Sequence, residues 1–133
     1  MPKIRGYYSI VQYCPDLARR EVVNIGVVLF VGEKSYLRVR LCEHNRRVKQ
    51  FFGTDTDELN YLTDFKESFK KRIEFEQDRI DSLERFEHFA SSRGNQLQLT
   101  HPALFKVGDC QSTLDELYER LVELPPDARQ KGN

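Results

Sequence analysis

The residues of this 133-residue chain that are best suited to chemistry are arginines gathered in its first third. Arginine binds phosphate or carboxylate through parallel N–H donors, so arginines that share one face of a sheet suit anion binding. Polar residues and a glycine lie beside them in the sequence. The candidate binding residues are therefore Arg19, Arg20, Glu21, Asn24, Gly26, Arg38, Arg40, Arg46 and Arg47.

Two interpretations of this arginine cluster stay open. Residues 1–53 hold ten Lys/Arg against four Asp/Glu, whereas residues 54–133 hold eleven against seventeen. In the first interpretation, the arginines of the basic half pair internally with an acidic helix that crosses the sheet. The other interpretation is an open basic surface that meets a phosphate group or an acidic partner.

Residue types that carry catalysis form no known motif in this chain. The histidines His44, His88 and His101 lie far apart, and no H-E-x-x-H, C-x-x-C, Walker or G-x-S-x-G pattern occurs. Cys42 and His44 are two residues apart, a spacing too common by chance to indicate zinc. We therefore predict no catalytic residues, no metal and no cofactor.

Length and composition indicate one globular domain, predicted over residues 1–126, with a flexible tail over 127–133. No apolar run approaches the ~20 residues that span a membrane, and the start lacks the apolar segment of a secretory signal. The three cysteines are widely spaced and odd in number, which indicates free thiols. We expect a cytoplasmic protein that is not bound to a membrane.

Apolar alternation predicts three strands, over residues 7–13, 21–31 and 35–42. In the hairpin formed by the last two, matching the apolar faces places Val31 opposite Ser35. The same register places Gly26 opposite Arg40. Gly26 would then leave room for the arginine stem, and Asn24 would join a polar network on that face.

From residue 43 onward, apolar residues recur at helical spacing. Gly53 is suited to end the first of these helices. Residues 57–91 contain no Pro or Gly, so we favour one helix about 50 Å long. Such a helix either bends near residues 76–80 or projects, and the second case would give a homodimer through this helix. A later strand is predicted over residues 96–100.

The last predicted helix begins at a capping box formed by Thr113 and Glu116. Together these elements predict an α+β fold. Its antiparallel sheet has three N-terminal strands and one later strand, and it is covered by helices, of which one is long.

The segment YYSIVQYCPDLARREVVNIGVVLF, residues 7–30, resembles the opening of a bacterial family of domains of unknown function, numbered 3037. Members of this family begin with a Tyr-rich strand and a Pro-Asp loop. An arginine, a glutamate, a valine and the pattern Asn-x-Gly-Val-Val-Leu follow. The terminal segment LDELYERLVE also resembles the usual ending of the family.

The resemblance implies a small protein that is often encoded beside a HipA-like kinase, in a toxin–antitoxin or phage-defence locus. It brings no catalytic residues. Our leading hypothesis is a non-enzymatic accessory or regulatory protein-interaction module, with a HipA-like kinase as its partner. The alternative is a nucleic-acid-binding module that uses the basic sheet face, and the third hypothesis is a nuclease or another enzyme.

Overall fold

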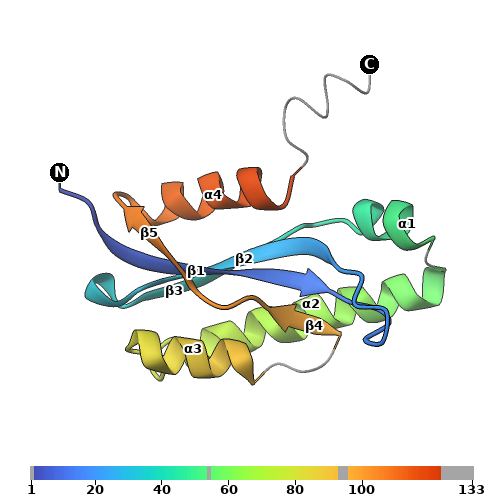
Figure 1. The fold of residues 1–133 in the computed structure, drawn as a ribbon, viewed down its shortest axis with the longest axis horizontal. Helices are drawn as coiled ribbons and strands as arrows, with labels where there is room; N and C mark the ends of the chain where they lie inside the picture. Colours follow the sequence, from blue (N-terminus) through green and yellow to red (C-terminus); the bar gives the residue numbers. More distant parts are fainter. Residues whose placement is uncertain (1, 54, 93–95, 124–133) are drawn as a thin grey trace, which may run out of the picture.

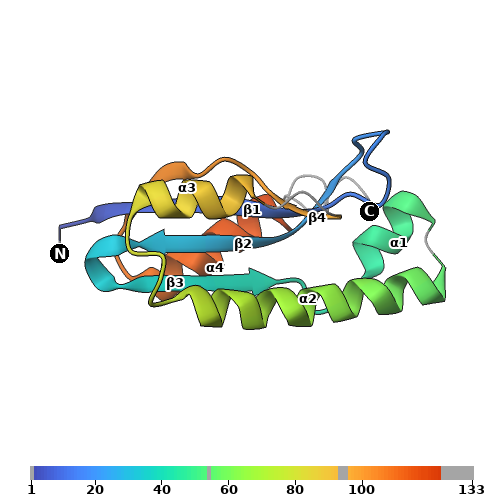
Figure 2. The ribbon, with the colours of Figure 1, turned by 90° about the horizontal axis from the view of Figure 1, so that it is seen from below.

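A five-stranded antiparallel sheet lies between two layers of helices (Figure 1). The computed structural model describes residues 2–53, 55–92 and 96–123. Helix α4 (Cys110–Leu121) covers one face of the sheet, and α2 (Thr56–Glu76) and α3 (Leu83–Ser91) cover the other (Figure 2). The α+β fold is thus confirmed, and the predicted tail lies outside the described residues.

The first strand occupies the middle of the sheet. β1 (Ile4–Tyr13) pairs on one side with β2 (Val23–Val31), which pairs in turn with the edge strand β3 (Tyr36–Leu41). On its other side β1 pairs first with β5 (Ala103–Val107) and then with β4 (Leu97–Leu99). Sequence analysis predicted β4 but missed β5, although exposed and partly buried residues alternate along it.

The predicted register of the β2–β3 hairpin is wrong by one residue. Val31 lies opposite Tyr36, and Gly26 lies opposite Leu41 rather than Arg40. The connection is a 3-10 turn, η1 (Gly32–Lys34), followed by Ser35 in a left-handed conformation with φ 47°. Every β2 residue except Asn24 is buried. Because both faces of β2 are covered, apolar alternation did not determine its register.

The predicted continuous helix over residues 57–91 is also wrong. The chain breaks between α2 and α3, and the Ser82 hydroxyl caps α3 by accepting from the Arg85 amide at 3.2 Å. The break returns the chain to its own sheet, where the Phe86 ring lies 5.6 Å from that of Phe30. Of the two alternatives predicted, the chain therefore turns close to residues 76–80, as the first proposed, and the projecting helix of the second does not form.

The short helix α1 (Arg46–Phe52) ends as predicted at Gly53, which has φ 62°. Helix α4 instead starts earlier than predicted. Its N-cap is Asp109, which accepts from the Ser112 amide at 2.9 Å, and this bond lowers the pKa of the Asp109 carboxyl. Thr113, the predicted cap, is buried.

No helix in the described part of the chain is both long and apolar enough to cross a membrane.

Candidate functional site

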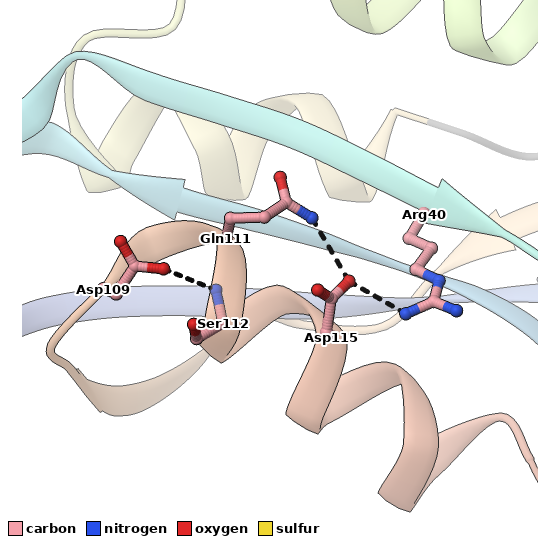
Figure 3. A network of polar contacts seen from close by, with 5 residues as sticks. All are labelled: Arg40, Asp109, Gln111, Ser112 and Asp115. Atoms are coloured by element: carbon pink, nitrogen blue, oxygen red, sulfur yellow. Dashed lines mark hydrogen bonds and ion pairs between the residues drawn. The ribbon is translucent and has the colours of Figure 1, made fainter.

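Arg40, a central member of the predicted arginine site, is held against α4 (Figure 3). Its Nη1 lies 2.8 Å from the Asp115 Oδ1, which also accepts from the Gln111 Nε2 at 3.2 Å. The guanidinium carbon lies 4.1 Å from the centre of the Tyr118 ring. The acidic helix that crosses the arginine face is therefore α4, and the internal ion pair accounts for Arg40.

The remaining arginines do not converge on Arg40. Arg19 pairs with Glu21 at 2.6 Å in the connection after β1, where Arg20 has φ 57°. Arg38 instead lines a hollow of about 480 Å³ beside Lys70 of α2.

Arg46 and Arg47 begin α1, and the Arg47 Nη1 is buried without a hydrogen-bond partner among the described residues. The nine predicted residues therefore belong to several sites on the fold.

Asn24 and Gly26 are explained by the architecture of the sheet. The Asn24 Nδ2 donates to the Leu121 carbonyl at 2.9 Å, and its Oδ1 accepts from the Gln12 Nε2 at 3.0 Å. A Cβ atom at Gly26 would lie 2.5 Å from the Leu41 Cδ2 and 2.7 Å from the Arg40 carbonyl oxygen. Gly26 was predicted to leave room for the Arg40 stem, but the groups that approach it are the Leu41 side chain and the Arg40 backbone carbonyl.

A buried lysine that was not predicted joins α2 to the end of β3. Lys66 is 6% exposed, and its Nζ donates to the Cys42 carbonyl at 2.9 Å and to the Asn45 Oδ1 at 2.6 Å. The His44 carbonyl accepts from the same atom at 3.2 Å. A signal was available, because Lys66 lies on the stripe of α2 that also carries the buried Leu62 and Phe69.

A second missed feature is a surface that we call the aromatic patch, formed by Tyr13, Phe51, Phe52, Tyr61 and Phe65. Phe51, Tyr61 and Phe65 are 61%, 65% and 40% exposed. The rings of Phe51 and Phe52 lie 5.0 Å apart, and those of Phe52 and Tyr13 lie 6.1 Å apart, both in edge contact. Phe51 and Phe65 recur with other apolar residues at helical spacing, yet both side chains are exposed.

A pocket of about 310 Å³ opens beside the aromatic patch. It is lined by Tyr13, Pro15, Glu58, Tyr61, Phe65 and Gln96. Burial, and after it the nearby Glu58 carboxylate, raise the pKa of the Tyr13 phenol. The Gln96 Nε2 donates to the Pro15 carbonyl at 3.0 Å, which fixes one wall of the pocket.

A further hollow, of about 680 Å³, lies between α2 and α3 and is lined by Arg72, Arg79 and Arg85 among others. Each of these guanidinium groups has a contact within the fold. Arg72 pairs with Glu76 at 2.9 Å, and Arg79 lies over the Phe75 ring at 4.2 Å. Arg85 donates to the Arg79 carbonyl at 3.0 Å.

In the part of the chain that the structure describes, no three His, Cys, Asp or Glu side chains are grouped so that they could hold a metal ion.

Comparison with known proteins assigns the chain to a family. No curated protein and no solved structure matches it. Residues 8–122, which run from β1 to the end of α4, match the family model described as a protein of unknown function, DUF3037. Because this match covers most of the chain, the protein belongs to the DUF3037 family.

Proposed function

We propose that this protein is a non-enzymatic accessory or regulatory module that binds another protein through the aromatic patch. The observation that carries the proposal is the exposure of Phe51, Tyr61 and Phe65 on neighbouring elements. Large exposed apolar surfaces mark interaction sites, and aromatic residues are enriched in the centres of interfaces. Binding would cover side chains that the fold itself leaves in water.

A HipA-like kinase in a toxin–antitoxin or phage-defence locus is the partner that we propose first, because the family resemblance implies such a neighbour. The proposal places the complex in the cytoplasm, and the three free cysteines support that compartment. The binding of nucleic acid by the arginine face remains an alternative. Because Arg40 is already paired with Asp115, the arginine face supports nucleic-acid binding less strongly than the aromatic patch supports a protein partner.

The test compares two double variants with the wild-type protein. Tyr61→Ser/Phe65→Ser changes the aromatic patch, whereas Phe75→Ser/Leu104→Ser removes two apolar side chains that are 57% and 55% exposed elsewhere. Each protein is titrated calorimetrically into a purified HipA-like kinase, the partner proposed here. We expect wild type and the control variant to bind and the aromatic-patch variant to lose at least tenfold in affinity, about 1.4 kcal/mol.

Equal binding by both double variants would contradict the proposal.

A pull-down from native cells with and without nuclease separates the alternatives, since loss of the captured proteins on nuclease treatment would favour a nucleic-acid-binding module. Light scattering of the protein alone tests the homodimer. A dimer that dissociates in Tyr61→Ser/Phe65→Ser would assign the aromatic patch to a second copy of the chain.

A further inference from the structure

We infer that the pocket beside the aromatic patch binds a cationic side chain, arginine or lysine, of the protein partner. This inference rests on the proposed function and adds the chemistry of the group that the partner inserts. The pocket is lined by residues from the end of β1, the connection after it, the first half of α2 and Gln96. The start of α2 lies toward one end of the molecule (Figure 1). Its wall carries three aromatic rings and one carboxylate, that of Glu58.

The aromatic lining suits a cation. The faces of aromatic rings attract ammonium and guanidinium groups, and several rings around one pocket strengthen this attraction. Tyr13 is 3% exposed and is held in place by its edge contact with Phe52, so its position is set before any ligand binds. Tyr61 and Phe65 are exposed and lie one helical turn apart on α2, which leaves them free to close on a ligand.

The charges around the pocket also favour a cation. The Glu58 side chain makes no ion pair or hydrogen bond within the described residues, although its backbone amide donates to Asp55. Asp57 and Asp64 are exposed and lie four and three residues from Tyr61, so they flank it on α2. From Thr56 to Ser68 the only basic residue of α2 is Lys66, which is buried against the end of β3. On the side of the pocket formed by α2, an anionic ligand would therefore meet like charges.

The pocket is large enough for one long side chain of a partner. Pockets for whole small molecules extend from about 300 to 1,000 Å³. This one, at about 310 Å³, lies at the lower end. A guanidinium group with its aliphatic stem would place the charge near Glu58 and the stem along Phe65, while the flanking residues of the partner cover the rest of the aromatic patch.

The test titrates two peptides into the isotopically labelled full chain and follows the backbone amide signals of residues 55–68 by NMR. The probe is Ac-Gly-Leu-Arg-Leu-Gly-amide, and its matched control carries citrulline, which is neutral and has nearly the same shape as arginine. We expect the arginine peptide to bind with a millimolar Kd and the citrulline peptide to bind about tenfold more weakly. Glu58→Gln should weaken arginine binding about fivefold, whereas Glu67→Gln on the exposed face of the same helix should leave it unchanged.

Equal binding of the two peptides, or binding that is unaffected by Glu58→Gln, would overturn the cationic specificity. The absence of any shift around Glu58 at ~20 mM arginine peptide would overturn the pocket as a site. Neither result decides whether the aromatic patch binds a protein, because the titration with the kinase measures that separately. Thermal unfolding of each variant shows whether a loss of binding reflects a loss of fold.

Discussion

The side-chain amide of Asn24 in β2 donates a hydrogen bond to the backbone carbonyl of Leu121, the last residue of α4, at 2.9 Å. The last carbonyls of a helix lack partners within the helix, so this bond satisfies one of them. The same side chain accepts from Gln12 of β1. One residue of the Asn-x-Gly pattern thus joins two strands to the helix that covers them.

We expect Asn24→Ala to reduce the free energy of unfolding by about 1–3 kcal/mol, because it leaves partly buried polar groups without partners. Urea unfolding measures the change. Asn60→Ala is the matched control, since Asn60 is exposed on α2. Equal losses in the two variants would show that the bond to Leu121 adds nothing to stability.

Gly26→Ala should destabilise the fold by about 1–3 kcal/mol through overpacking. The added methyl group would lie within 3 Å of both the Leu41 side chain and the Arg40 carbonyl oxygen. Because that oxygen belongs to the paired strand, it cannot move away without disturbing the hairpin. Thermal unfolding tests this expectation against Gly108→Ala, where an added Cβ meets no atom within 4 Å. An unchanged Tm for Gly26→Ala would contradict the close packing of β2 against β3.

Lys66→Met should cost about 1–3 kcal/mol, because the carbonyls of Cys42 and His44 and the Asn45 amide lose a charged donor. Lys70→Met removes an exposed lysine from the same helix and should change stability by less than about 0.5 kcal/mol. Hydrogen exchange adds a local readout, since amides of the β3–α1 connection should lose protection only in Lys66→Met. Unchanged protection there would show that Lys66 does not hold this connection.

The ion pair between Arg40 and Asp115 should contribute little by its charge. Their side chains are 39% and 42% exposed, and pairs in water are worth about 0.2–1 kcal/mol. A double-mutant cycle with Arg40→Gln and Asp115→Asn should give a coupling in that range, and 1 M salt should reduce it. A coupling above about 2 kcal/mol at high salt would instead identify a strongly desolvated pair.

The strands of this fold could be predicted because apolar and polar residues alternate along them, but their register could not. Val27 and Val28 are both fully buried, so a shift of β3 by one residue still pairs apolar side chains with β2. The break after α2 was missed for a different reason. It contains no Pro or Gly, and Ser82 is recognisable as a cap only once Phe86 is seen against the sheet.

The candidate site was harder to predict because residue type does not reveal the partner of a side chain. Arg40 resembles a ligand-binding arginine until Asp115, 75 residues later, is placed beside it. Phe65 fits the apolar stripe of α2, yet it is 40% exposed, whereas Leu62 and Phe69 on either side of it along the helix are buried. Helical spacing identifies a stripe, but the packing of the neighbouring elements decides which of its residues are buried.

The measurement that tests the central claim most directly is photo-crosslinking in native cells, with p-benzoylphenylalanine placed at Phe65 or, as the control, at Phe75. Both side chains are exposed on α2, 40% and 57%, but only Phe65 belongs to the aromatic patch. We predict one discrete protein crosslinked from Phe65, resistant to nuclease and identified by mass spectrometry as the same partner that binds in the titration. Equal crosslinking from the two positions, or none from Phe65, would contradict a protein-binding role for the aromatic patch.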